Sequence, residues 1–439
     1  MTLRAARSIF PAVHYFSYRE QSLHCEGVNL ENVAERFGTP TYVYSARTVR
    51  ENFQRLDRAL APLDHLICFA LKANSNLAIL DLLGREGAGF DIVSAGELFR
   101  VLKSGGRADR CTFAGVGKTR EELEYALREG VYCFNVESEG ELERINDVAG
   151  TLGLRAPIAI RVNPDVDAKT HKYISTGKSQ NKFGIGLDRA LDVYAVAAAL
   201  PNIRIRGVQT HIGSQILDAA PFAEAATKLT DLVVELKNRY QIEFFSIGGG
   251  IGIVYDEALA SGSAAWWSDH PDRITPEKYA EAIVSILAPL GLRILFEPGR
   301  FLVGNAGVLL STVQYVKQTP AKTFTIVDAA MNDLIRPALY EGWHEIVPLR
   351  ETSSEKSPMD IVGPVCESGD FFAQDRALPP LVPGARIGLM SAGAYGFVMS
   401  SNYNSRPLLA EVLIDGDKIH EIRSRQSLND LIAGEALAR

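Results

Sequence analysis

The sequence LICFALKAN, at residues 66–74, joins six apolar residues directly to a lysine and a polar turn. A short apolar run bounded by polar residues is typical of a buried β-strand. Lys72 therefore stands where a strand ends. An amine that is partly withdrawn from water there loses proton affinity and can react with a carbonyl group. Taken alone, the stretch also fits a lysine whose amine reaches solvent, so its function depends on the rest of the chain.

The region around this stretch repeats one pattern, a short apolar run followed by a segment with helical spacing. The eight runs are 66–71, 89–93, 111–114, 132–136, 157–162, 205–210, 244–247 and 293–296. Apolar residues recur every three or four positions between them, for example at 120–129 and 221–240. Eight strands that alternate with helices predict a TIM-like (β/α)8 barrel. A doubly wound open sheet is the alternative, but no single glycine-rich fingerprint marks a switch point.

After residue 300 the pattern changes to short β-rich runs separated by turns. These runs cover 308–316, 323–327, 345–349, 361–365, 387–390 and 408–414. They predict an all-β domain, a β-barrel or β-sandwich, over 301–439. Residues 1–40, with a strand-like run at 12–18 and a helical pattern at 31–37, are expected to pack with that domain. The barrel itself is predicted for 41–300.

The composition is that of a soluble globular protein, with 46% hydrophobic and 23% charged residues among 439. A net charge of −7 gives no electrostatic basis for binding nucleic acid or an anionic membrane. No transmembrane span or signal peptide is expected. Five scattered cysteines, an odd number, indicate a reducing compartment and predict a cytoplasmic protein. Four of them lie near apolar runs, whereas Cys366 stands in a polar, turn-rich stretch that suits an exposed thiol.

Most of the predicted barrel strands end in polar residues or glycine, and the C-terminal strand ends form the active face of such barrels. The residues are Lys72, Asp91, Ser94, Asn135, Arg161, His211, Ser214, the glycines 248–250, Glu297, Gly299 and Arg300. Three successive glycines let backbone N–H groups surround an anion, where these barrels bind phosphate. Glu297 either pairs with Arg300 or holds the protonated nitrogen of a heteroaromatic cofactor. His211 is either a core histidine or a side chain that lies against a flat ring.

The β-rich region carries three further groups of polar residues at predicted turns. RPALY, at 336–340, offers the guanidinium of Arg336 for bidentate capture of a carboxylate, or for a surface salt bridge. CESGD begins at Cys366, and GAYG places Tyr395 in a turn. The chain has no metal-ligand pattern and no serine-nucleophile motif, so no metal is predicted.

Eight motifs, in this order, resemble those of the meso-diaminopimelate decarboxylases, which use pyridoxal 5′-phosphate and combine an alanine-racemase-like barrel with a β domain. The matching segments are FALKAN at 69–74, GFDIVS at 89–94, HIGSQ at 211–215, GGG at 248–250, EPGR at 297–300, RPALY at 336–340, CESGD at 366–370 and GAYG at 393–396. The resemblance implies decarboxylation of meso-2,6-diaminopimelate to L-lysine and CO2, the last step of lysine biosynthesis.

The resemblance also implies a role for each motif. Lys72 is implied to hold the cofactor as an imine, His211 to stack on its ring, and Glu297 to keep the ring nitrogen protonated. The other implied cofactor contacts are Asp91, Ser214, Gly249, Gly250, Gly299, Arg300 and Tyr395, where the glycines and Tyr395 bind the phosphate. The implied substrate contacts are Arg300, Arg336, Tyr340, Glu367 and Tyr395. Cys366 is implied to protonate the carbanion left by CO2, acting from the neighbouring subunit of a homodimer with shared active sites.

Two alternatives stay open. A related decarboxylase could act on ornithine or arginine, but these substrates lack the distal carboxylate that Arg300, Arg336 and Tyr340 fit. A non-catalytic relative could merely bind the cofactor, but such a protein is expected to have lost a reactive group. The three residues whose loss would signal this, Lys72, Glu297 and Cys366, are all present.

Overall fold

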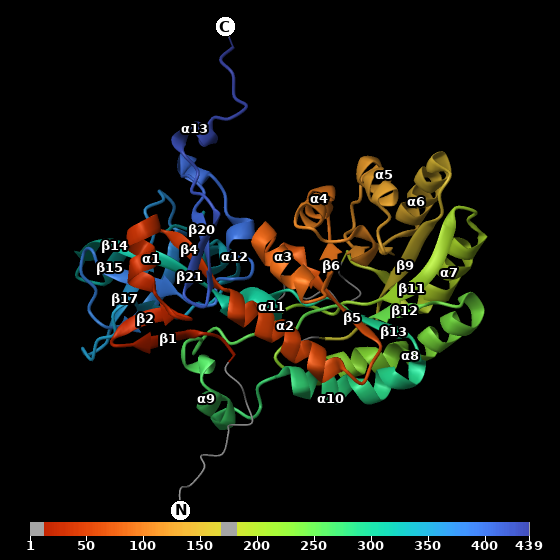
Figure 1. The fold of residues 1–439 in the computed structure, drawn as a ribbon, viewed down its shortest axis with the longest axis horizontal. Coiled ribbons are helices and arrows are strands. Elements are labelled where there is room, and N and C mark those ends of the chain that lie inside the picture. Colours follow the sequence, from red (N-terminus) through yellow and green to blue (C-terminus); the bar gives the residue numbers. More distant parts are fainter. Residues whose placement is uncertain (1–12, 168–181, 439) are drawn as a thin grey trace, which may run out of the picture. The chain divides into compact units, whose positions relative to one another are not determined.

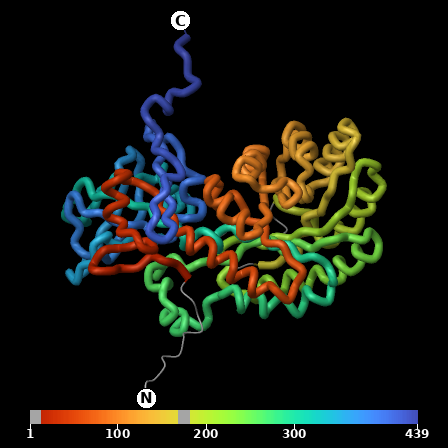
Figure 2. Tube along the Cα trace, viewed as in Figure 1, coloured from red at the N-terminus to blue at the C-terminus, as the bar shows by residue number. Residues whose placement is uncertain are grey.

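The computed structural model describes residues 13–167 and 182–438, and the chain divides into two compact units. The barrel unit comprises Arg50–Ile253 and Arg273–Leu302. The β unit comprises Met1–Val49, Val254–Asp272 and Val303–Arg439. Figure 1 labels most of the elements of both, and Figure 2 traces the same chain as a tube coloured along the sequence. Within the described ranges, no helix has the length and apolar character needed to cross a membrane.

The barrel unit contains a closed ring of eight parallel strands. They are β5 (His65–Ala70), β6 (Gly89–Ile92), β7 (Cys111–Phe113), β8 (Cys133–Val136), β9 (Ala156–Asn163), β11 (Ile203–Gln209), β12 (Phe244–Ser246) and β13 (Arg293–Phe296), with the short β10 (Ile185–Gly186) added at β9. The pairings of β13 with β5 and of β8 with β9 close the ring. Each predicted run forms one of these strands, so the TIM-like barrel is confirmed.

Helices alternate with these strands and lie outside them, as Figure 1 shows. They are α2 (Ala46–Leu60), α3 (Leu77–Arg85), α4 (Ala95–Lys103), α5 (Arg120–Glu129), α6 (Glu139–Leu152), α7 (Ala190–Ala199), α8 (Ala220–Tyr240), α10 (Pro276–Leu287) and α11 (Arg300–Val303). The sequence determines several of their ends. Thr119 and Glu122 form a capping box at the start of α5, and Pro221 stands in the first turn of α8.

The inside of the barrel changes from apolar to polar along the strands. A buried cluster of Leu66, Cys68, Tyr132, Cys133, Ala159, Phe244 and Leu295 fills the middle of the barrel. Successive side chains of a strand point to opposite faces. The residue two positions after each member of this cluster therefore also points into the barrel. For four strands those next residues are polar, namely Asn135, Arg161, Ser246 and Glu297, whereas on β5 the residue is Ala70. The fold therefore places a polar layer at the C-terminal ends of the strands.

The described residues of the β unit form two sheets. A three-stranded sheet consists of β1 (Phe16–Arg19), β2 (Ser22–Cys25) and β3 (Val28–Asn29). A nine-stranded sheet contains β4 (Thr41–Ser45), β14 (Gly307–Gln318), β15 (Thr323–Val327), β16 (Ile346–Pro348), β17 (Ser357–Val362), β18 (Phe371–Leu378), β19 (Arg386–Leu389), β20 (Ala410–Asp415) and β21 (Lys418–Arg423). The helices of this unit are α1 (Leu30–Phe37), α9 (Ala264–Asp269), α12 (Arg336–Tyr340) and α13 (Leu428–Leu431).

The boundaries of the units differ from the sequence prediction in two places. The prediction began the barrel at residue 41, whereas β4 pairs with β14 and β20 in the β unit. The prediction also kept 254–272 in the barrel region, whereas this segment belongs to the β unit, where Trp266 and Trp267 pack on Val254. Both segments have partners that are distant in the sequence, since β4 pairs with β14 and β20, and Asn305 Nδ2 donates to the carbonyl oxygen of Val254 over 2.9 Å. Strands β18 and β21 were not predicted because much of each is exposed and polar.

Candidate active site

A ring of buried polar side chains occupies the C-terminal end of the barrel. Strand register places Asp91 opposite Thr112, and Gln209 opposite both Arg161 and Ser246. These side chains, together with Asn135 and Glu297, are at most 7% exposed. They stand above the apolar layer, where burying a polar group without a partner is costly. We call this set of side chains at the C-terminal end of the barrel the polar ring.

Lys72 lies in a short 3-10 turn, Leu71–Ala73, directly after β5. Its Nζ donates a hydrogen bond to Asp91 Oδ2 over 3.2 Å. The side chain of Lys72 is 42% exposed, while that of Asp91 is 1% exposed. The amine is thus accessible, and a buried carboxylate holds it at the rim of the polar ring. The expected position of Lys72 at the end of a strand is confirmed.

Glu297 follows β13 and is held by two neutral donors. Ser246 Oγ donates to Glu297 Oε1 over 2.7 Å, and Gln209 Nε2 donates to Glu297 Oε2 over 2.9 Å. Burial raises the pKa of Glu297 to about 7, and the nearby Asp91 acts in the same direction. The two hydrogen bonds and the charge of Lys72 lower that pKa. A positive charge placed beside Glu297 would therefore favour its ionised form.

His211 and the glycine run pack against each other beyond β11 and β12. The backbone N–H of Gly249 donates to His211 Nδ1 over 3.2 Å, which leaves any ring proton on Nε2. Burial lowers the pKa of His211 well below its ordinary value, and the charges of Arg161 and Lys72 act in the same direction. The imidazole is therefore neutral near pH 7.

Close backbone packing explains two of the glycines at this face. A Cβ on Gly249 would overlap the carbonyl oxygen of Glu297. A Cβ on Gly299 would lie 2.9 Å from the Cβ of Ala73, beside Lys72. The loops after β5, β12 and β13 thus touch through positions that only glycine allows. Next to them, Arg300 Nη2 donates to Ser214 Oγ over 3.1 Å.

In the β unit, Arg336 is a buried cation at the start of α12. Its Nη1 lies 2.7 Å from His344 Nε2, and its guanidinium lies 4.4 Å from the centroid of the Tyr255 ring. His344 Nδ1 lies 2.7 Å from the carbonyl oxygen of Met390, which can only accept, so Nδ1 carries the proton. Nε2 of a neutral His344 therefore accepts from Arg336. The histidine and the tyrosine fix the orientation of the guanidinium.

The other predicted residues of the β unit lie at turns. Tyr340 ends α12 and is half-buried. Cys366 and Glu367 are exposed in the loop between β17 and β18, while the other four cysteines are buried. The expected exposure of Cys366 is thereby confirmed. Tyr395 adopts a left-handed backbone conformation with φ of 54° in the turn after β19.

Comparisons with known proteins identify the family. Residues 46–304 match the family model described as "Pyridoxal-dependent decarboxylase, pyridoxal binding domain". The diaminopimelate decarboxylase of Pseudomonas aeruginosa is 51% identical over 423 residues, which are 96% of this chain and 99% of that protein. The chain belongs to the diaminopimelate decarboxylase family. Among solved structures, the Helicobacter pylori member complexed with L-lysine is 43% identical, with a TM-score of 0.86 over 92% of this chain and 98% of that one. The M. jannaschii member in co-complex with L-lysine is 35% identical, with a TM-score of 0.89 over 98% and 99%.

The polar ring fits the pyridoxal phosphate that this family uses. Within 13–167 and 182–438, several of its buried atoms have no hydrogen-bond partner. They are Asp91 Oδ1, both amide atoms of Asn135, Arg161 Nη2, Gln209 Oε1 and the hydroxyls of Thr112 and Thr210. Each such atom costs about 1–3 kcal/mol when left unsatisfied. A polar ligand at this end of the barrel, with its own acceptors and donors, would recover part of that cost.

The barrel unit brings together nine of the residues predicted for this family site. They are Lys72, Asp91, His211, Ser214, Gly249, Gly250, Glu297, Gly299 and Arg300. The other five, Arg336, Tyr340, Cys366, Glu367 and Tyr395, belong to the β unit. The sequence prediction gave no role to Gln209 and Ser246, the two donors to Glu297. Each is polar and stands two residues before a predicted motif, which is the signal that would have found them.

Proposed function

We infer that this chain decarboxylates meso-2,6-diaminopimelate to L-lysine and CO2 with pyridoxal phosphate. The support comes from relatives named diaminopimelate decarboxylase, which have nearly the same length as this chain and are 44–51% identical to it. The observation in this chain that carries the proposal is the buried Glu297, oriented by Ser246 and Gln209. When bound, the cofactor supplies a protonated ring that accepts the electron pair left when CO2 departs. A carboxylate at the ring nitrogen is the group that keeps that proton in place.

The other residues of the barrel unit take binding roles in this proposal. Lys72 attaches the cofactor through Nζ, and Asp91 orients the amine beforehand. The neutral His211 would lie against the flat ring of the bound cofactor, where a charged imidazole would repel the protonated ring nitrogen. Gly249, Gly250 and Gly299, with Ser214 and Tyr395, bind the phosphate through backbone N–H groups and hydroxyls. Arg300, beside Ser214, contributes positive charge to the cofactor and the substrate.

Residues of the β unit take the substrate roles. Arg336, already oriented by His344, binds the distal carboxylate that remains in the product. Tyr340 shares that carboxylate, and Glu367 binds the distal amine. Cys366 protonates the carbon from which CO2 departs, and its exposed thiol leaves it open to such contacts.

We further propose a homodimer in which the loop with Cys366 and Glu367 serves the neighbouring subunit. The exposure of residues 366–368 in the single chain supports this arrangement. Five cysteines without a disulfide support a reducing compartment such as the cytoplasm. The net charge of −7 supports a protein that binds no nucleic acid.

The test is CO2 release by the purified enzyme from meso-diaminopimelate, L-ornithine, L-arginine and L-lysine, each at equal concentration. Lys72→Ala, which removes the reactive amine, serves as the inactive control. We expect turnover of meso-diaminopimelate alone, because only that substrate keeps a carboxylate for Arg336 after decarboxylation. Turnover of ornithine without turnover of meso-diaminopimelate would refute the proposal.

A further inference from the structure

The loop that carries Cys366 is a compact turn joining β17 to β18. Glu367 N–H donates to the carbonyl of Val365 over 2.8 Å, and Asp370 N–H donates to the carbonyl of Glu367 over 3.0 Å. Its tip, residues 366–368, is exposed. Within the single chain, the exposed tip is therefore held mainly through the residues at its base.

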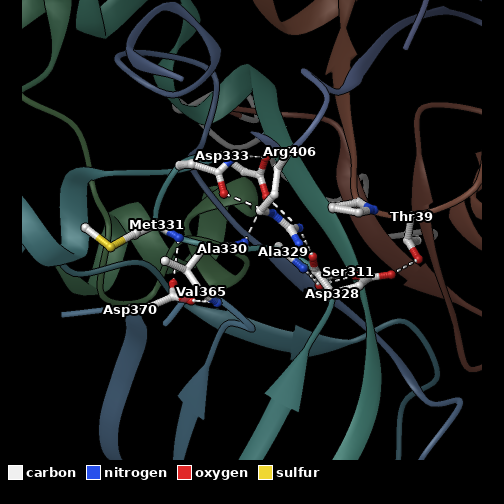
Figure 3. A network of polar contacts seen from close by, with 12 residues as sticks. Thr39, Ser311, Asp328, Ala329, Ala330, Met331, Asp333, Val365, Asp370 and Arg406 are labelled. Atoms are coloured by element: carbon white, nitrogen blue, oxygen red, sulfur yellow. Dashed lines mark hydrogen bonds and ion pairs between the residues drawn. The ribbon is translucent and has the colours of Figure 1, made fainter. Parts of the chain in front are cut away.

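Asp370 holds that base with both carboxylate oxygens. Oδ2 accepts the backbone N–H of Val365 over 2.7 Å, and Oδ1 accepts the backbone N–H of Met331 over 2.6 Å (Figure 3). Asp370 is 4% exposed. One buried carboxylate thus joins the residue before Cys366 to a segment more than thirty positions earlier in the chain. Hydrogen bonds to an ionised acceptor are about twice as strong as neutral ones.

The segment that contains Met331 is itself held by hydrogen bonds. Asp333 Oδ2 accepts the N–H of Ala330 over 2.9 Å, and Arg406 donates to the carbonyl of Asp328 over 2.5 Å and to Asn332 Oδ1 over 3.1 Å. Figure 3 shows Ala330, Asp333 and Arg406 close together, with Asp328 beside them. The same segment leads directly into α12, which begins at Arg336. These hydrogen bonds hold the segment whose Met331 N–H donates to Asp370.

Because Gly363 has no side chain, it leaves space for the carboxylate of Asp370. A Cβ at this position would lie 2.6 Å from Asp370 Oδ1 and closer still to Oδ2. Its backbone is outside the left-handed region, so alanine there meets no backbone strain, and the three atoms nearest to its Cβ all belong to the Asp370 carboxyl group. Gly363→Ala would therefore displace the carboxylate while leaving Asp370 in the chain.

We propose that Asp370 is a positioning residue, whose carboxylate fixes the Cys366–Glu367 turn to the segment that leads into α12. The inference rests on the proposed function, because it makes Asp370 act through Cys366 and not on the substrate. Without the carboxylate, the N–H groups of Val365 and Met331 lose their common acceptor and the turn moves. The Cys366 thiol is then in a position to donate its proton for less of the time. The residues of the barrel unit that bind the cofactor are unchanged.

The test compares Asp370→Asn, Asp370→Ala and Gly363→Ala with the wild-type holoenzyme. Asp375→Asn is the matched control, because Asp375 lies on the adjacent β18 and pairs with Lys322. We expect kcat to fall about tenfold or more in the three variants, the equivalent of one lost charge-assisted hydrogen bond. KM and the cofactor absorbance are expected to change by less than about twofold, and Asp370→Asn, which keeps one acceptor oxygen, is expected to lose less than Asp370→Ala.

Hydrogen exchange of the holoenzyme provides a readout independent of turnover. Fragments containing Met331 and Val365 are expected to exchange faster together in all three variants and to stay unchanged in Asp375→Asn. If Asp370→Ala does not fold, Asp370→Asn and Gly363→Ala carry the test. Unchanged kcat in an active enzyme, or unchanged exchange at both fragments, would overturn the proposal. Failure of the wild type to turn over meso-diaminopimelate would instead refute the proposed function. The hydrogen-exchange result alone would then test whether Asp370 links Val365 to Met331.

Discussion

Replacing Glu297 by glutamine should stabilise the cofactor-free protein at high pH and yet abolish most of its activity. The folded-state pKa of Glu297 is about 7, against an ordinary value of 4.5. The folded chain therefore gives up this proton at higher pH than the unfolded chain, and the free energy of unfolding falls as pH rises through that window. The difference of about 2.5 pKa units corresponds to about 3 kcal/mol at pH values above 7.

Glu297→Gln lacks this titration, and its surroundings can accommodate the amide. Gln209 has an unpartnered Oε1 and now donates through Nε2. Rotation of its amide would present Oε1 to the new Nε2 of residue 297. The neutral side chain therefore keeps the packing and the hydrogen bonds. It cannot, however, hold a proton on the ring nitrogen of the cofactor, so turnover should fall steeply.

The assay is urea unfolding of wild type and Glu297→Gln, both without cofactor, at about pH 5 and about pH 8. The advantage of the variant should grow by about 2–3 kcal/mol between the two pH values. Comparison at each pH cancels the titration of other buried acids such as Asp333, whose pKa is also raised, to about 6. An equal stability difference at both pH values, or a variant with normal turnover, would show that the reasoning about Glu297 is wrong.

Two further predictions concern the proton donor and the glycine loop. Cys366→Ala should keep the cofactor absorbance but lose most turnover, because its thiol lies outside the barrel unit; normal turnover would remove its role as an acid. Gly249→Ala should weaken cofactor binding about tenfold or more in a spectroscopic titration, because its Cβ would overlap the Glu297 carbonyl oxygen. Gly140→Ala, in α6, is the control, because its Cβ would meet no atom within 4 Å; equal affinities in both variants would contradict the close packing.

The barrel could be predicted because its strands are buried on both faces and therefore read as continuous apolar runs. Chain order then set the order of the strands around the ring, since parallel neighbours are joined by crossover connections that contain helices. The same pattern predicts that Lys72, His211 and Glu297 lie at strand ends. Which of these residues touch the cofactor stays a prediction.

The sequence by itself thus determined the barrel, the family and the exposed position of Cys366, all of which depend on local pattern and ordered motifs. Only the tertiary structure decided that β4 joins the β unit, that Ser246 and Gln209 orient Glu297, and that Asp370 links Val365 to Met331. The physical reason is the same in each case. A hydrogen bond between segments tens to hundreds of residues apart leaves no periodic trace in either one, because each partner is an ordinary polar residue until the fold brings the two together.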